Sequence, residues 1–151
     1  MKNILFGIIL LASTNCSNGP EPINYGHDSC DKCRMQIMDP KYGTELVTSK
    51  GKIYKFDSIE CLVFYSKNMN DDDNSTLWVT DFLNKNELVD KNKAYFLLSE
   101  NLISPMGLNL TAFSSQTDLN KIKNQYQGRE LKWNELIEYV NHEWQHQTTH
   151  H

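Results

Sequence analysis

The stretch that decides the fold runs from residue 44 to residue 61: Thr44-Glu-Leu-Val-Thr-Ser-Lys-Gly-Lys-Ile-Tyr-Lys-Phe-Asp-Ser-Ile-Glu-Cys61. Its first part holds two segments rich in strand-forming residues, 44–49 and 52–56. Lys50-Gly51 lies between them, and a short turn containing glycine between two such segments is typical of a β-hairpin. The stretch therefore predicts two adjacent strands joined by a tight turn.

The end of the same stretch predicts a helix. Asp57 and Glu60 are three residues apart, which is the spacing of a capping box. Apolar residues then recur at helical intervals, namely Ile59, Leu62 and Val63. We expect a helix over 58–68 that has Asp57 as its N-cap and contains Cys61. A strand predicted at 77–80 completes a β-β-α-β unit.

The second half of the chain predicts the same order of elements. They are strands at 94–98 and 110–113, a helix that starts at Thr117 or Asp118 and ends before Gly128, a strand at 130–133 and a helix at 134–146. We therefore expect an α+β fold of two packed β-β-α-β units with a C-terminal helix.

The N-terminus has the features of an export signal. Lys2 is followed by nine apolar residues, 4–12, and a membrane span takes about twenty. Cys16 stands where a cleavage site is expected, which resembles the lipobox of bacterial lipoproteins. We expect residues 1–16 to be a lipoprotein signal peptide ending at the lipidated Cys16. Ordinary secretion is the alternative.

The export signal also predicts how the rest of the chain is organised. Residues 17–26 are rich in turn formers and predict a flexible tether, followed by one domain over 27–146 and a disordered, His-containing tail over 147–151. We expect the domain to face the periplasm in the cell envelope, held to a membrane by the lipid. This compartment is oxidising. Three thiols remain besides Cys16, so at least one is free or bound to something.

Charge and motifs exclude two classes of function. The net charge of −4 leaves no basic stripe that would attract nucleic acid. Nothing in the sequence resembles a nucleophile with an activating base, a phosphate-binding loop or paired catalytic carboxylates. We expect neither a nucleic-acid-binding protein nor an enzyme.

Cys30-Asp-Lys-Cys33-Arg-Met35 carries the clearest chemistry. Two thiolates and a thioether within six residues can converge on one soft ion, and such donors favour Cu(I). Methionine is the discriminating residue, because zinc sites use Cys, His, Asp and Glu. Three other interpretations stay open: a zinc site completed by His27 and Cys61, a redox dithiol, and a local disulfide.

Other residues have both a chemical and a structural interpretation. Met106 lies in a Pro-Met-Gly turn, which can aim a sulfur atom or simply pack a loop. For Cys61, the role of a small buried apolar residue in its helix is favoured over that of a metal ligand. His142 and His146 are four residues apart and share one helix side. They could form a secondary metal site or belong to a solvated polar face.

Three groups of residues, in this order, resemble the NosL family, the lipoprotein accessory factors of nitrous oxide reductase. They are Cys30-Asp-Lys-Cys33-Arg-Met35-Gln-Ile, Tyr54-Lys-Phe56-Asp57-Ser-Ile59-Glu-Cys61, and Ser104-Pro105-Met106-Gly107 with Thr111-Ala112-Phe113-Ser114. The resemblance runs from Cys30 to Ile137. It implies a pair of β-β-α-β units and a Cu(I) chaperone that serves the apo-enzyme of nitrous oxide reductase. It also implies an ABC-type membrane complex as a partner in the same assembly.

The resemblance further implies a set of copper ligands. Cys33, Met35 and Met106 match the copper-binding positions of the family. Cys30 matches a cysteine that is commonly present in the motif. The domain expected over 27–146 is then a metal-binding domain whose ion is Cu(I).

The chain departs from the family at several positions. Arg34 replaces the glycine that usually precedes the motif methionine, and Glu60 and Leu62 flank Cys61 where the family has Gly and Met. Leu-Asn-Leu, at 108–110, follows the methionine turn in place of a glycine-rich run. These departures concern site geometry and the partner more than the identity of the metal.

Three alternative functions make distinguishable predictions. A structural zinc module with His27, Cys30, Cys33 and Cys61 as ligands would not need Met35 or Met106. A thiol oxidoreductase that uses the Cys-x-x-Cys pair would turn over disulfides without metal. A copper-storing or copper-sensing lipoprotein would have the same site and no client enzyme.

Overall fold

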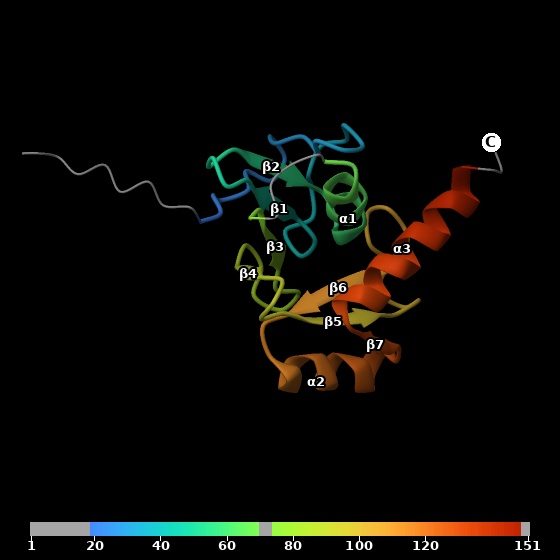
Figure 1. Cartoon of the computed structure of the whole chain (residues 1–151). Helices are drawn as coiled ribbons and strands as arrows, with labels where there is room; N and C mark the ends of the chain where they lie inside the picture. The colour runs from blue at the N-terminus through green and yellow to red at the C-terminus, as the bar shows by residue number, and fades with distance from the viewer. Residues whose placement is uncertain (1–18, 70–73, 149–151) are drawn as a thin grey trace, which may run out of the picture.

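The computed structural model describes residues 19–69 and 74–148. The predicted signal peptide 1–16, with Cys16, and residues 149–151 of the tail lie outside the described residues. Two antiparallel sheets and three helices in the described part form an α+β fold (Figure 1), as predicted. The elements are β1 (Thr44–Val47), β2 (Ile53–Phe56), α1 (Ile59–Lys67), β3 (Thr76–Thr80), β4 (Leu88–Asp90), β5 (Tyr95–Leu98), β6 (Leu110–Phe113), α2 (Gln116–Tyr126), β7 (Arg129–Leu131) and α3 (Trp133–Thr148).

The first sheet has the strand order β2-β1-β3-β4. β1 and β2 form the predicted hairpin, in which Glu45 lies opposite Lys55. All four residues of β1 are buried, because β2 and β3 pair with its two edges and α1 packs on it. The sequence does not predict β4, since three residues are too few to show a period.

Helix α1 starts one residue later than its predicted cap implies. Ser58, not Asp57, is the N-cap: its backbone is extended, with φ −160°, and its Oγ accepts a hydrogen bond from the Cys61 N–H at 3.4 Å. Serine and aspartate are about equally good caps. The predicted cap role of Asp57 is therefore wrong, and the Asp57 carboxylate is available to other partners.

The second sheet has the order β6-β5-β7, and α2 lies on its side away from the first unit (Figure 1). Ser115 caps α2. Its Oγ accepts the Asp118 N–H at 3.1 Å and donates to Asp118 Oδ2 at 2.7 Å. The predicted caps, Thr117 and Asp118, thus lie inside the helix. Gly128 follows α2 with φ 133°, and a Cβ there would lie 2.4 Å from the Leu98 carbonyl oxygen.

Helix α3 is longer than predicted at both ends. Trp133, expected to end a strand at 130–133, is the first residue of α3, and the helix continues to Thr148. Two residues of the predicted tail are therefore helical. The helix runs from the second unit to α1 (Figure 1), where the rings of Phe64 and Trp144 stack with their centroids 4.8 Å apart.

The segment before the predicted domain packs against it. Ile23 is a member of the apolar core, and the Glu21 N–H donates to Glu45 Oε2 at 2.9 Å. The Lys55 ammonium donates to the Pro22 carbonyl at 3.0 Å. Residues 21–26, expected to be the end of the flexible tether, are thus held by the first sheet.

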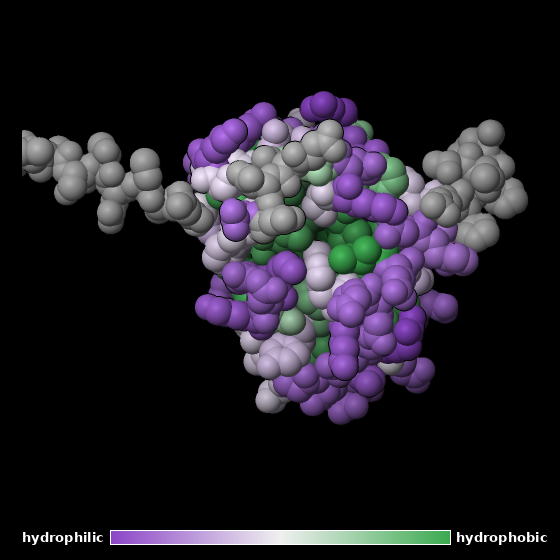
Figure 2. All heavy atoms as spheres, viewed as in Figure 1, coloured by the Kyte–Doolittle hydropathy of each residue, from purple (hydrophilic) through white to green (hydrophobic). Residues whose placement is uncertain are grey.

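The larger of two apolar clusters contains residues of both units. It includes Phe56 and Leu62 from the first unit and Leu110 and Leu136 from the second. On the face shown in Figure 2, polar side chains cover most of the surface and apolar ones gather near the middle. Among the described residues, no helix combines the length and the apolar character that a membrane span requires.

Candidate metal centre

Three cysteines and one aspartate come together in the first unit. The ligand atoms of Cys30, Cys33, Asp57 and Cys61 all lie within 4.8 Å of one another. Cys30 and Cys61 are fully buried, Asp57 is 3% exposed, and Cys33 is half-buried. The described part of the chain holds no second cluster of this kind.

The fold brings these residues together from separate segments. Cys30 and Cys33 lie in the loop before β1, Asp57 directly follows β2, and Cys61 lies in the first turn of α1. Lys55 of β2 fixes the loop to the sheet: the Asp31 N–H donates to the Lys55 carbonyl at 2.8 Å. The N–H of Lys55 donates to Asp31 Oδ2, also at 2.8 Å.

The cysteine loop is a tight backbone knuckle. The Cys30 N–H donates to the Met35 carbonyl at 2.8 Å, and the Arg34 N–H donates to the Cys30 carbonyl at 2.9 Å. The Cys33 N–H lies 3.5 Å from Cys30 Sγ and stabilises negative charge there. Arg34 has φ 67°, a left-handed conformation that favours glycine. Glycine, which the resemblance implies at this position, would adopt this backbone more readily than Arg34.

The three thiols differ strongly in acidity. The hydrogen bond from the Cys61 thiol lowers the pKa of Cys30 to about 6, although burial opposes the shift. Donating that bond raises the pKa of Cys61, and burial adds to the rise. Burial also raises the pKa of Cys33 to about 12. Cys30 is therefore the most acidic of the three thiols, and a Cys33 or Cys61 thiol that binds an ion must first lose its proton.

Asp57 contributes the carboxylate of the cluster. Its Oδ2 accepts a hydrogen bond from Cys33 Sγ at 3.4 Å. Its Oδ1 is buried and has no hydrogen-bond partner. Sequence reasoning did not identify Asp57 as a cluster member, and it named Cys61 as a ligand only in the alternative zinc site. The available signal was Ser58, which can cap the helix and so release Asp57.

The methionines predicted as ligands occupy different environments. Met35 is 46% exposed, and Met106 is half-buried and packs against the core that contains Cys30 and Cys61. The Met106 turn is fixed to α1, because the Ser104 hydroxyl donates to the buried Glu60 carboxylate. The ligand roles of Met35 and Met106 stay predictions.

Neither His27 nor His142 joins the cluster. His27 is exposed, and the structure groups Asp57 with the three cysteines in its place. The side chain of His142 is 67% exposed, and its Nδ1 lies 3.0 Å from Glu143 Oε1. The side chain of His146 lies outside the described part of the structure. A secondary site at His142 and His146 stays a prediction.

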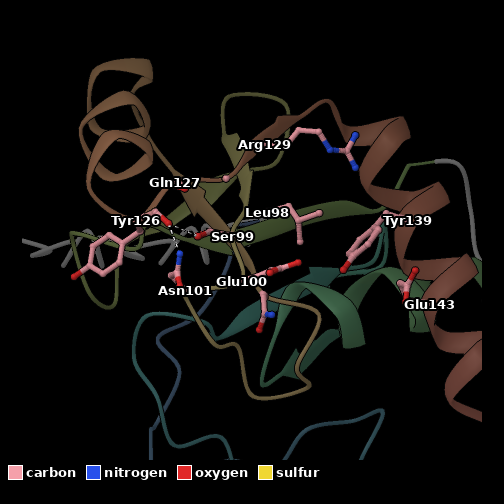
Figure 3. A pocket seen from close by; sticks show the side chains of 11 residues that line it. Leu98, Ser99, Glu100, Asn101, Tyr126, Gln127, Arg129, Tyr139 and Glu143 are labelled. Carbon is pink, nitrogen blue, oxygen red and sulfur yellow. Dashed lines mark hydrogen bonds between the residues drawn. The ribbon is translucent and has the colours of Figure 1, made fainter.

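A pocket of about 550 Å³ lies away from the cluster, in the second unit (Figure 3). It is bordered by the loop after β5, the end of α2 and one face of α3. Ser99 Oγ and Asn101 Nδ2 donate to the Tyr126 carbonyl on one side, and Tyr139 and Glu143 lie on the other. None of the four cluster residues lines it.

Comparison with known proteins finds a sequence family and a similar solved structure. The sequence model of the NosL family matches residues 23–140 of the chain. The crystal structure of the copper chaperone NosL from Shewanella denitrificans is similar, with a TM-score of 0.65 and 21% sequence identity. The match covers 78% of this chain and 95% of that chain, and it shows a shared fold. No curated protein matches the chain.

Proposed function

The chain belongs to the NosL family, and we propose that it binds one Cu(I) ion in the cysteine cluster and delivers it to a copper enzyme. Nitrous oxide reductase in its apo form is the proposed client. Copper is the cargo of this protein and undergoes no reaction on it. The copper chaperone with the same fold supports this role.

The convergence of three thiols carries the proposal. Cys30, Cys33 and Cys61 have their sulfur atoms within 4.8 Å of one another, which is close enough for one ion to contact all three after a small contraction. Thiolate donors favour soft Cu(I) over harder ions. Met35 and Met106 are proposed as additional thioether donors during capture and release.

The unequal burial of the donors supports transfer. Cys30 and Cys61 are fully buried, whereas Cys33 is half-buried and Met35 is 46% exposed. An incoming ligand from a partner can therefore reach the ion on the Cys33 side while two thiolates still hold it. Such ligand exchange never requires free copper.

We propose that the protein is a lipoprotein of the cell envelope, as the resemblance to the NosL family implies. Lipidated Cys16 would hold the protein to a membrane of the cell envelope with its domain facing the periplasm. An ABC-type membrane complex would act in the same assembly. The N-terminal features of the sequence support the anchor, and family membership supports the partners.

An anaerobic Cu(I) titration of the reduced protein against a chromogenic chelator tests the binding step. We expect one tight equivalent, weakened at least tenfold by Cys30→Ser, Cys33→Ser or Cys61→Ser, because losing even an outer partner of a metal site costs about 10–100-fold. Met35→Leu and Met106→Leu should weaken binding less. Unchanged affinity in all three cysteine variants would refute the site.

The delivery step needs a separate assay. Copper-loaded protein is mixed with apo nitrous oxide reductase, and the copper content of the re-isolated enzyme is measured with an excess of chelator present. We expect the enzyme to gain copper despite the chelator, and copper supplied as the chelator complex to give no gain. Equal gain from both sources would contradict delivery.

A further inference from the structure

A buried glutamate lies next to a cysteine of the cluster. Glu60 directly precedes Cys61 in α1 and is 0% exposed. The resemblance to the NosL family implies glycine at this position, so the carboxyl group is a feature of this chain. Burying a carboxyl group is costly unless it is hydrogen-bonded, so its hydrogen-bond partner indicates what the group does.

The partner of Glu60 belongs to the turn that carries Met106. The loop between β5 and β6 reaches α1 (Figure 1), where the Ser104 hydroxyl donates to the Glu60 carboxylate. The same Ser104 Oγ accepts the Asn109 N–H at 2.9 Å, and the Ser104 carbonyl accepts the Gly107 N–H at 3.0 Å. Ser104 therefore closes the turn around Met106 and joins it to α1 through Glu60.

Little of this turn is buried. Pro105 and Gly107, on either side of Met106, are exposed, and Ile103 is 76% exposed. Met106 itself is half-buried against the larger apolar cluster. Because apolar packing covers so little of the turn, the hydrogen bond to Glu60 is the contact that fixes the turn relative to α1.

We propose that Glu60 is a positioning residue for copper exchange, which holds the Met106 thioether in place relative to the cysteine cluster before the ion arrives. Glu60 and Cys61 share one helical turn, so α1 fixes a thiolate directly and the thioether through Ser104. A donor that is already in place loses less conformational entropy when it binds an ion. The inference rests on the proposed copper function, in which Met106 is an additional donor.

Methyl NMR of the reduced, metal-free full chain, labelled at its methionine methyl groups, tests the positioning without copper. Glu60→Leu removes the acceptor at similar volume, and Ser104→Ala removes the donor. We expect both changes to lower the order parameter of the Met106 methyl group and to move its chemical shift toward that of Met38, which is 63% exposed. Glu60→Gln keeps an oxygen acceptor, so it should leave the Met106 signal in place.

Two controls accompany this measurement. The Met38 signal should be the same in every variant. Glu45→Leu removes the other buried glutamate of the first unit and should leave the Met106 signal unchanged. If Glu60→Leu does not fold, Ser104→Ala tests the same hydrogen bond, and an unchanged Met106 signal in Ser104→Ala overturns the inference.

Release of Cu(I) to an excess of chelator then connects the position of Met106 to copper exchange. We expect Met106→Leu and Glu60→Leu each to speed release at least about threefold. The double variant should release Cu(I) no faster than Met106→Leu alone, because the two residues act as one unit. Effects that multiply in the double variant overturn the inference. Failure of the unmodified protein to bind Cu(I), with the methyl results as expected, would contradict the proposed copper function instead.

Discussion

Two glutamates are buried in the first unit, and each faces a different part of the molecule. Glu60 accepts the Ser104 hydroxyl and thereby holds the Met106 turn against α1. Glu45, in the middle of β1, accepts the Glu21 N–H and lies 4.0 Å from the Lys55 ammonium. Burial raises the pKa of both carboxyl groups, and that of Glu45 reaches about 7.

Glu45 makes the stability of the fold depend on pH. Because its pKa in the fold lies above the ordinary 4.5, its contribution is fully present below pH 4.5 and is lost as the pH rises through about 7. Each pH unit in this window changes the free energy of unfolding by up to about 1.4 kcal/mol. Glu45→Gln should flatten the profile across this window. Urea unfolding of the metal-free protein measures it.

Burial also raises the pKa of Glu60, so Glu60 changes the free energy of unfolding with pH in the same direction in both proteins. Only the difference between the two profiles therefore belongs to Glu45. Parallel profiles for Glu45→Gln and the unmodified protein would mean that Glu45 is charged in the fold and fully paired with Lys55.

The sequence predicts only some of the residues of the cysteine cluster. Cys30 and Cys33 are three residues apart, and this spacing alone suggests that both could bind one metal ion. Asp57 and Cys61 join them only because α1 begins after Ser58 and packs its first turn on the cysteine loop. Asp57 and Ser58 are both good N-cap residues, and the capping-box spacing to Glu60 favours Asp57. The sequence therefore favours structural roles for Asp57 and Cys61.

Helix α2 shows the same ambiguity at the scale of an element. Three polar residues within four positions, Ser115, Thr117 and Asp118, are all reasonable caps by composition. The structure selects Ser115, because its backbone is extended, with φ −133°, and its Oγ accepts the Asp118 N–H. The hydrophobic spacing fixes where the apolar face lies but not which polar residue starts the helix.

Replacing the observed cap tests this assignment. Ser115→Ala should lower the free energy of unfolding by about 1 kcal/mol, because the Asp118 N–H loses its acceptor. Thr117→Ala, at the cap predicted from the sequence, should change it by less than about 0.5 kcal/mol. Denaturant unfolding measures both. A larger loss in Thr117→Ala than in Ser115→Ala would contradict the cap.

Elements with strong local signals are predicted well. The β1–β2 hairpin depends on residues that are adjacent in the sequence, and the structure confirms it. β4 has three residues and takes its conformation from pairing with β3. Trp133 likewise looks like a strand residue locally but begins α3, because the helix packs across both units.

Asp81 connects the first unit to the second. The residue forms a parallel bridge to Ala112, which connects the end of β3 to β6. Its carboxylate accepts N–H groups from Ser114, Leu83 and Asn84 at 2.8–2.9 Å. Burial would raise the pKa of Asp81, but the hydrogen bonds outweigh it and lower that pKa below its usual value.

Removing this carboxylate should weaken the whole fold. Asp81→Ala leaves several N–H groups at the junction without an acceptor, at a cost of about 1–3 kcal/mol in the free energy of unfolding. Asp90→Ala, which removes an exposed turn contact, should cost less than about 0.5 kcal/mol. Thermal unfolding at neutral pH compares them. Equal effects would mean that the junction relies on apolar packing alone.

The order of elements in both units follows from the sequence, but their docking does not. The parallel bridge at Asp81, the stacking of Phe64 on Trp144 and the shared core all join residues far apart in the chain. No local period encodes such contacts. The packing of residues 21–26 on the first sheet is equally non-local, because it depends on Glu45 and Lys55.

Copper K-edge X-ray absorption of the Cu(I)-loaded protein, measured beside its Cys61→Ser variant, tests the central claim most directly. The account predicts a first shell of sulfur alone, with three thiolates in the unmodified protein and one fewer in the variant. A shell containing nitrogen or oxygen donors, or an identical spectrum for the two proteins, would contradict a copper site built from Cys30, Cys33 and Cys61.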